Sequence, residues 1–299
     1  MANKNLKENK LKRALVSPFR GIVKSISKIW YVKYQYKYIT HNELNLKNPT
    51  KYTEKLQYLR LFTYPKNDLV SKCAGRVGVR EYVTENKLKS ILVPIYGIYD
   101  SFDEIDFERL PDQFVMKCSH ACAFNYICLD KSTIDIPLLR IKFRRWLRTN
   151  YGKKTVEMHY SKIKPQIIIE KYLGKAPTEY KIHVFNGVAK YMYVVTGRGT
   201  DIRYNNYYID WTPFDGAQFN GWKKTSKELV KPDNWDEMVK IAEKLAKPFP
   251  FVRVDLYNID GKVYLSEMTF TPAKGTLIFD DPKADNEIGK WLKIDIDKK

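Results

Sequence analysis

The sequence predicts an α+β protein whose second half is rich in strands. Apolar runs typical of strands follow one another after Gln166, and the turns Asn186-Gly187 and Asp260-Gly261 between such runs are strong hairpin signals. In the first half, segments with mixed charge and spaced apolar residues are typical of helices. Apolar residues make up 44% of the 299 residues, which is enough for a packed core and excludes global disorder.

Each element is predicted from its local pattern. The elements expected in the first half are, in order, helices over 50–62 and 68–90, a strand over 90–99 interrupted by Pro94 and Gly97, a short acidic helix over 103–110, strands over 113–116 and 126–129, and a basic amphipathic helix over 138–150. The second half is expected to contain strands over 166–169, 182–185, 189–196, 251–257 and 262–265, and one helix over 235–247.

The charge of the chain predicts an anionic partner. Lys and Arg outnumber Asp and Glu by 53 to 34, a net charge of +19, which favours nucleic acid, a membrane surface, a nucleotide or an acidic polymer. No zinc-finger, RRM or helix-turn-helix pattern accompanies the charge, so we expect no nucleic-acid partner.

About half of that charge lies in residues 1–40, within a basic N-terminal segment that comprises residues 1–45. Between residues 15 and 38 basic side chains alternate with apolar and aromatic ones, and Arg20, Lys24 and Lys28 recur every four residues, on one helical face. This pattern is typical of an amphipathic segment lying on an anionic membrane. Pro18 and Gly21 interrupt a single helix, so a solvated tail is the alternative.

The sequence favours a cytosolic protein. No apolar run approaches the roughly 18–20 residues that span a bilayer, and basic residues interrupt the N-terminus where a signal peptide needs an apolar stretch. Four cysteines make no disulfide framework, which fits a reducing compartment. The basic segment would hold the protein peripherally at the inner face of the cell membrane.

Carboxylates are expected to meet on the last predicted hairpin. Strand alternation gives Arg253 and Asp255 one face, and Glu267 and Thr269 share a face of the strand after the Asp260-Gly261 turn. Facing carboxylates are costly unless a cation lies between them, and Mg²⁺ takes oxygen ligands. The alternative is that Asp255 simply pairs with Arg253 or another base.

Two earlier strands end in polar residues. The strand at 114–117 ends in Lys117, and the strand at 167–171 ends in Glu170 and Lys171. A lysine that leaves a core strand can contact phosphate as a point charge. Together with the carboxylates of the last hairpin, this order resembles the ATP-grasp fold, in which two α+β subdomains clamp ATP.

Several longer stretches resemble one family more closely. They are REYV (80–83), ILVPIYGIYDSFDEIDFERLPDQFVMKCSH (91–120), NYG (150–152), HYSKIKPQIIIEKYL (159–173), EYKIHVFNG (179–187), FPFVRVDLY (249–257) and SEMTFTPAKG (266–275). The chain is similar, from about residue 46 to 291, to the TupA-like ATP-grasp family of surface-polysaccharide gene clusters. Members are often labelled glycosyltransferases or, by analogy with the fold, carboxylate–amine ligases.

The resemblance implies a role for each candidate site residue. It implies that Lys117 contacts the α- and β-phosphates of ATP, that Glu170, Lys171 and Leu173 form the adenine and ribose hinge, and that Ser119 and His120 follow in the phosphate loop. It implies Mg²⁺ ligands at Asp255, Glu267 and Thr269, where Thr269 replaces the Asn of many ATP-grasp enzymes, and catalytic roles for Lys181, Arg253 and Arg198. The alternatives are a surface ion pair for Glu170–Lys171 and a solvated loop residue for Arg198.

The same resemblance divides the chain into four parts. Residues 1–45 are the basic segment, 46–110 a mostly helical region, 111–165 the N-terminal ATP-grasp subdomain, and 166–299 the C-terminal subdomain. ATP and Mg²⁺ are the cofactors it implies.

The chain departs from the family pattern at two places. Residues 75–78 read Gly-Arg-Val-Gly where the family usually has an Asp-Lys-Tyr-type stretch, and residues 119–124 lack the usual glycine-rich loop. Without glycine, we expect ordinary backbone geometry in that loop and a weaker grip on phosphate. The loop region also contains Cys118, Cys122 and Cys128 beside His120, which we interpret as buried, reduced cysteines rather than a zinc site or a nucleophile.

The leading hypothesis is an ATP-dependent carboxylate–amine ligase of surface-polysaccharide biosynthesis (capsule or O-antigen type). It would join a uronic-acid carboxylate of an acidic or lipid-linked glycan to an amino acid or other amine through an acyl phosphate. One alternative is a nucleotide-sugar-dependent glycosyltransferase, for which Asp280-Asp281 is a weak metal motif. The other is an inactive ATP-grasp scaffold, suggested by the altered loop.

Overall fold

The computed structural model describes residues 26–174, 177–219, 221–226 and 229–296. The helices are α2 (Lys28–Thr40), α3 (Tyr52–Tyr58), α4 (Asp68–Ala74), α5 (Gly78–Glu85), α6 (Ile136–Leu147), α7 (Tyr151–Thr155), α8 (Trp235–Ala246) and α9 (Pro282–Trp291). The strands are β1 (Ile95–Tyr99), β2 (Phe114–Cys118), β3 (Asn125–Cys128), β4 (Ile167–Lys171), β5 (Glu179–Phe185), β6 (Val188–Thr196), β7 (Arg203–Tyr208), β8 (Phe251–Ile259) and β9 (Lys262–Thr269).

Two antiparallel sheets organise the fold. The larger has the order β7-β6-β5-β8-β9, and its hairpins β5–β6 and β8–β9 turn at Asn186-Gly187 and Asp260-Gly261. All four turn residues have positive φ, between 48° and 83°, which is what a two-residue hairpin turn needs for its twist to match the strands. Both predicted hairpins are therefore confirmed.

The smaller sheet has the order β1-β4-β2-β3. It draws β1 from the region 46–110, β2 and β3 from 111–165, and β4 from beyond residue 165, so the sheet crosses the predicted boundaries at 110 and 165. β4 lies in its middle, paired with both β1 and β2, which explains why Ile167, Ile168 and Ile169 are all fully buried. α6 covers this sheet with Leu139 and Phe143.

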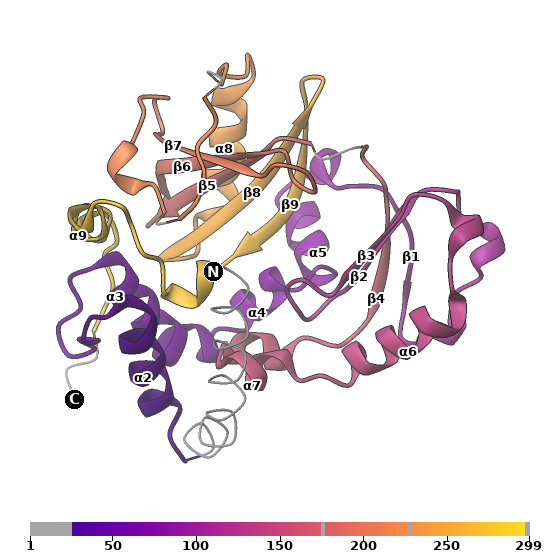
Figure 1. Ribbon diagram of the computed structural model, residues 1–299, viewed down its shortest axis with the longest axis horizontal. Helices are drawn as coiled ribbons and strands as arrows, with labels where there is room; N and C mark the ends of the chain where they lie inside the picture. The colour runs from indigo at the N-terminus through magenta and orange to yellow at the C-terminus, as the bar shows by residue number, and fades with distance from the viewer. Residues whose placement is uncertain (1–25, 175–176, 220, 227–228, 297–299) are drawn as a thin grey trace, which may run out of the picture.

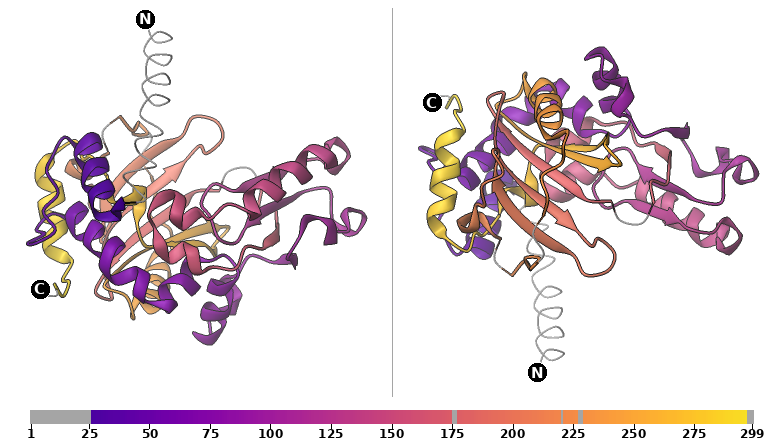
Figure 2. Two further views of the ribbon diagram at one scale, coloured as in Figure 1. Left: turned by 90° about the horizontal axis from the view of Figure 1, so that it is seen from below. Right: turned by 90° about the horizontal axis from the view of Figure 1, so that it is seen from above.

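The helical region packs on the larger sheet. Tyr52 and Leu56 of α3, Val70 of α4 and Val83 of α5 belong to the same apolar core as β5, β8 and α8. In Figure 1, α4 and α5 lie between the two sheets, and both views of Figure 2 show the smaller sheet and α6 extending away from the rest of the molecule. This helical region therefore lies between the two sheets.

Several elements differ from those predicted. The segment 50–62 is α3 followed by a π-helical turn, and the helix predicted over 68–90 is two helices because the chain is extended at Gly75. The acidic helix predicted over 103–110 is two 3₁₀ turns, each capped by its own side chain, Ser101 and Asp106. β7, α7 and α9 have no counterpart among the predicted elements.

Part of the basic N-terminal segment packs against the body as α2. Val32 and Tyr36 are buried beside Leu44 and Val156. The Tyr36 hydroxyl lies 2.8 Å from the Thr53 hydroxyl. The repeat positions 20 and 24 lie outside the described residues. Among the residues described, no helix is long and apolar enough to cross a membrane.

Candidate functional site

The β8–β9 hairpin places Asp255 opposite Glu267, as predicted. Val254 and Leu256 are fully buried in the core, and Arg253 and Asp255 share the opposite face of β8. The ladder shifts register between Asp255 and Leu256, because β9 carries one extra residue there. The pair of carboxylates thus lies beside an irregular point of the sheet.

Asp255 is held by two cations. Its Oδ1 accepts from Arg253 Nε at 2.6 Å, and its Oδ2 accepts from Arg253 Nη2 at 2.7 Å and from Lys181 on the neighbouring strand β5. Burial acts to lower the pKa of Lys181, but Asp255 and Glu179 outweigh burial and raise it, so Lys181 stays charged. The pairing with Arg253 that the sequence offered as an alternative is present in the structure.

Thr269 links the arginine to the second carboxylate. Its hydroxyl accepts from Arg253 Nη2 at 3.0 Å and donates to Glu267 Oε1 at 3.2 Å. Glu267 is the more accessible carboxylate, with 31% of its side chain exposed, whereas Asp255 is fully buried. Its nearest cationic nitrogens are more distant than those of Asp255, at 3.5 Å in Arg76 and 3.6 Å in Arg253.

The donor chemistry of the hairpin fits Mg²⁺. Asp255, Glu267 and Thr269 offer only oxygen atoms, and Mg²⁺ is usually bound by one or two carboxylates together with water and substrate phosphates. Glu267 is the open position, since both oxygens of Asp255 already accept hydrogen bonds. Across the described residues, no three His, Cys, Asp or Glu side chains form a group that could hold a metal ion.

Glu179 extends the charged cluster along β5. Its Oε2 lies 3.0 Å from Lys181 Nζ and 2.7 Å from Arg198 Nη2, and its Oε1 accepts from the Tyr257 hydroxyl at 3.4 Å. Burial acts to raise the pKa of Glu179, but the two cations outweigh it and lower the pKa. Arg198 is therefore connected to Lys181 through Glu179, although half of its side chain is exposed.

Lys117 and Glu170 form an ion pair across β2 and β4, with Nζ and Oε2 2.5 Å apart. Burial acts to raise the pKa of Glu170, but Lys117, with help from Arg76, lowers it overall. The pairing partner of Glu170 is thus Lys117 rather than its neighbour Lys171, which is exposed at the end of β4. Leu173 follows, half-buried.

The loop after β2 is held by Ser119. The buried Ser119 hydroxyl donates to the Lys164 carbonyl at 2.6 Å and accepts from the Gln166 N–H at 2.9 Å, so it positions the loop. His120 is buried too, with Nε2 3.1 Å from the Thr149 carbonyl, and burial lowers its pKa. The expectation of ordinary backbone geometry is wrong at Ala123, whose φ is 61° without a glycine.

Cys122 lies in the same loop and contacts Tyr160, with Sγ 3.4 Å from the hydroxyl. Burial raises the pKa of the Cys122 thiol to about 11, so the thiol is protonated near neutral pH. Cys118 and Cys128 are buried and free. These observations agree with reduced cysteines and give no support to a cysteine nucleophile.

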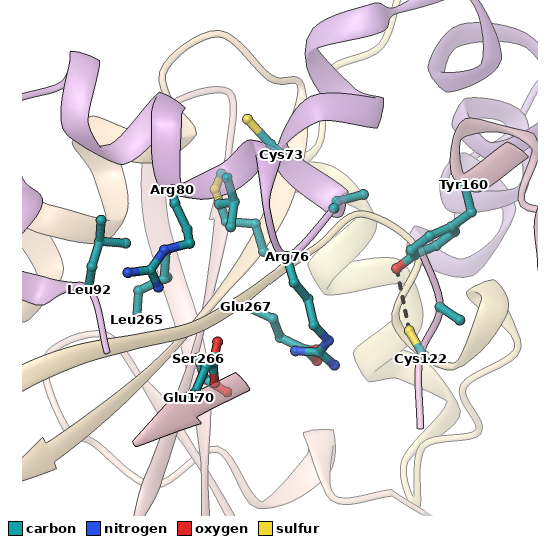
Figure 3. Close-up of a pocket in the computed structure, with 15 residues that line it drawn as sticks. Cys73, Arg76, Arg80, Leu92, Cys122, Tyr160, Glu170, Leu265, Ser266 and Glu267 are labelled. Atoms are coloured by element: carbon teal, nitrogen blue, oxygen red, sulfur yellow. Dashed lines mark hydrogen bonds and ion pairs between the residues drawn. The ribbon is translucent and has the colours of Figure 1, made fainter. Parts of the chain in front are cut away.

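A pocket opens beside this cluster (Figure 3). Its walls come from residues 73–80, from Ala121 and Cys122, from Glu170 and from residues 265–268 of β9. Arg76 lies against Glu267, and Arg80 extends from α5 beside Leu92 and Leu265 (Figure 3).

Comparison with models of protein families shows to which family the chain belongs. A model of TupA-like ATP-grasp proteins matches residues 54–293. The chain belongs to the TupA-like ATP-grasp family. Its fold is therefore the α+β ATP-grasp fold. No relative is found among curated proteins.

Solved structures to which this chain is similar include two D-alanine–D-alanine ligases. The one from Bacillus anthracis, complexed with ATP, is 14% identical, with a TM-score of 0.42 over 74% of this chain and 61% of that one. The one from Helicobacter pylori is 15% identical, with a TM-score of 0.45 over 81% and 67%. An L-amino acid ligase from Bacillus licheniformis is 12% identical, with a TM-score of 0.40 over 69% and 42%. This chain thus spans less than two thirds of two of these proteins.

Sequence reasoning missed four polar residues of the TupA-like site. Glu179 lies two residues before Lys181 on the same strand face, so strand alternation alone could have found it. Tyr193, whose hydroxyl accepts from Arg253 Nη1 at 2.8 Å, lies on β6 opposite Lys181, and only the strand order could reveal it. Arg76 and Arg80 lie in and next to the stretch where the chain departs from the family pattern.

Proposed function

We propose that the protein is an ATP-dependent carboxylate–amine ligase. Two observations support this function: membership of an ATP-grasp family, and a buried cluster of Arg253, Asp255 and Lys181 that ends at the accessible carboxylate of Glu267. Fixed cations beside an accessible metal-binding carboxylate suit the transfer of a phosphoryl group, because charge spreads over its oxygens in the transition state.

The proposed reaction has two steps. A carboxylate oxygen of the acid attacks the γ-phosphorus of ATP, the bond to the bridging oxygen breaks, and ADP leaves. The nitrogen of the amine then attacks the acyl carbon and loses a proton, and inorganic phosphate leaves with the former carboxylate oxygen. Neither step needs a side-chain nucleophile, which agrees with the protonated state of Cys122.

The cations of the site would act as fixed counter-charges. Lys117 would contact the α- and β-phosphates, and Lys171 and Leu173 the adenine and ribose. Arg253 and Lys181 are held by Asp255, which would position them beside the phosphoryl group. Arg198, tied to Glu179, would approach from the exposed side.

The metal-binding residues would be Glu267, Asp255 and Thr269. Bound Mg²⁺ would supply further neutralisation of phosphate charge. To make room for the ion, Asp255 would exchange part of its contact with Lys181 or Arg253, since both of its oxygens accept hydrogen bonds from them.

We further propose that the acid is a uronic-acid carboxylate on an acidic or lipid-linked glycan of surface-polysaccharide biosynthesis, and that the amine is an amino acid or similar compound. The net charge of +19 supports an acidic polymer as substrate. A cytoplasmic enzyme peripheral to the inner membrane face would meet such a substrate.

The two rival functions have less support. Asp281 caps helix α9 by accepting a hydrogen bond from the Lys283 N–H at 2.9 Å. This structural role explains the aspartate without a glycosyltransferase metal site. The hypothesis of an inactive scaffold was based on the absence of glycine from the loop. Ala123 nevertheless adopts a positive φ in that loop, as a glycine would.

ADP release tests the proposal. The purified protein would be incubated with MgATP, a panel of uronates and a panel of amino acids, and ADP measured in a coupled assay. We expect ADP release that needs both an acid and an amine and that Glu267→Gln abolishes. Stabilisation by a nucleotide sugar but not by MgATP in a thermal-shift screen would instead support the glycosyltransferase.

A further inference from the structure

The pocket beside the cluster is walled mainly by residues outside the proposed nucleotide site. Among the side chains to which the family resemblance assigns a role, only Glu170 and Glu267 line it. Its other walls are the α4–α5 region, the 121–122 loop and the apolar side chains of Leu92 and Leu265. The pocket therefore adjoins the nucleotide site, shares Glu170 and Glu267 with it, and differs from it in most of its lining.

Two arginines give this pocket its chemistry. The Arg76 N–H donates to the Ser119 carbonyl at 3.1 Å, which fixes the residue beside the loop, and its guanidinium lies 3.5 Å from Glu267. The Arg80 guanidinium is half-buried and has no hydrogen-bond or ion-pair partner in the part of the chain that the structure describes. Burial lowers the pKa of Arg80, and Glu170 opposes this only in part.

An arginine with this environment is suited to an anionic ligand. Desolvating a guanidinium without a partner is costly, and a carboxylate restores the lost hydrogen bonds, often through two parallel contacts. Figure 3 shows Arg80 extending from α5 beside Leu92 and Leu265, while Arg76 lies beside Glu267, and both arginines line the pocket.

We propose that this pocket binds the acid substrate and that Arg76 and Arg80 hold its carboxylate next to Glu267. Leu92, Leu265 and other apolar wall residues would pack against the carbon skeleton of the acid. This inference rests on the proposed ligase function, because it sets the acid beside the carboxylate that would hold the metal and the phosphoryl donor.

A binding measurement tests this without turnover. Glucuronate, galacturonate and glutamate serve as probes, titrated calorimetrically into the full chain saturated with Mg²⁺ and a non-hydrolysable ATP analogue. We expect Arg80→Gln to weaken binding of the preferred probe by about tenfold or more, the loss of one charge-assisted contact, with the affinity for the ATP analogue unchanged. Arg145→Gln, at an exposed arginine of α6, is the matched control and should behave as wild type.

Several outcomes would overturn the inference. They are a wild-type protein that binds the ATP analogue but none of the three acids, and an Arg80→Gln variant that loses the analogue rather than the acid. Arg80→Lys serves if Arg80→Gln fails to fold, and should weaken acid binding because lysine lacks the planar fork. Acid binding through Arg80 without ADP release would refute the ligase alone, whereas ADP release with an unchanged KM for the acid in Arg80→Gln would refute the pocket alone.

A second, independent observation concerns α2. Val32 and Tyr36 face the body, while Trp30 and Tyr34, four residues apart, form a stripe on the opposite side with 60% and 38% of their surface exposed. Such a stripe on a helix that is already packed on one side is unusual for a solvated surface.

The charge of the helix indicates what covers the stripe. α2 carries Lys28, Lys33 and Lys37 and no acidic residue, although Lys37 contacts Glu43 just beyond the helix. Tryptophan and tyrosine place an apolar ring and a polar edge at a membrane interface, and lysines add attraction to anionic headgroups. We infer that α2 lies on an anionic lipid surface through this aromatic stripe.

Co-sedimentation of the full chain with vesicles tests this second inference. We expect binding to phosphatidylcholine–phosphatidylglycerol vesicles, and a loss of about tenfold or more in affinity when Trp30 and Tyr34 are both replaced by serine. Tyr96→Ser, at an exposed tyrosine of β1, is the control and should bind as wild type. Undiminished binding of the double variant, or dimerisation through this face in place of vesicle binding, would overturn the inference.

Discussion

Replacing Asp255 should destabilise the fold more than replacing any other acid of the site. Asp255 is fully buried, accepts from Arg253 at 2.6 and 2.7 Å, and contacts Lys181. Asp255→Asn would leave two buried cations short of a counter-charge, and removing one partner of a buried pair costs about 3–5 kcal/mol. At about 2–4 °C per kcal/mol for a chain of this size, the Tm should fall by about 6–20 °C.

Glu267→Gln is the matched comparison. Glu267 is 31% exposed in its side chain, and its nearest cationic nitrogens lie at 3.5 and 3.6 Å, so the replacement should cost less than about 1 kcal/mol. Urea unfolding followed by tryptophan fluorescence would give the free energy of unfolding of both variants. If Asp255→Asn proves no more destabilising than Glu267→Gln, the reasoning that ties stability to the buried cluster is wrong.

Three further predictions concern single side chains. Lys117→Ala should weaken MgATP binding about tenfold or more in calorimetry, because a phosphate loses a charged donor. Burial lowers the pKa of His159 in the folded protein to about 3, whereas its pKa in the unfolded chain is about 6.5. The free energy of unfolding should therefore be constant above about pH 6.5 and fall by about 1.4 kcal/mol per pH unit below it. His159→Phe should remove that slope when stability is measured by urea unfolding at several pH values. Cys122→Ser should retain ADP release, and wild-type Cys122 should react slowly with iodoacetamide at neutral pH, because its pKa is about 11.

Each of these has a contradicting result. An unchanged affinity for MgATP in Lys117→Ala would contradict the place of Lys117 in the nucleotide site. The control for this measurement is Lys142→Ala, at an exposed lysine of α6. Stability–pH profiles of His159→Phe and wild type that run parallel would mean that His159 is not held neutral. Loss of ADP release in a folded Cys122→Ser variant would reopen a chemical role for the thiol.

Local signals predicted the hairpins but not the exact register of the carboxylates. Asn186-Gly187 and Asp260-Gly261 fix two-residue turns. The turn at Asp260-Gly261 alone would place Asp255 opposite Ser266, and the extra residue in β9 moves the pairing to Glu267. β7 could not be predicted, because Arg203–Tyr208 reads RYNNYY and lacks the apolar alternation of a half-buried strand.

The cationic partners of Asp255 and Glu267 that lie far away in the sequence could not be predicted, because they depend on the order of the strands in the sheet and on helix packing. Lys181 reaches Asp255 because β5 lies next to β8, although the two residues are 74 positions apart. Arg76 reaches Glu267 only because the α4–α5 region packs between the sheets. The sequence predicted Mg²⁺ between the carboxylates and offered Arg253 as the alternative partner of Asp255, and in the structure Arg253 contacts both carboxylates.

The most direct test of the ligase proposal follows the oxygen of the carboxylate. A uronate labelled with heavy oxygen in its carboxyl group would be incubated with the protein, MgATP and an amine, and the inorganic phosphate analysed by mass spectrometry. An acyl phosphate route predicts that each phosphate released carries one labelled oxygen from the acid. Amide product with unlabelled phosphate, or label in AMP, would contradict the account.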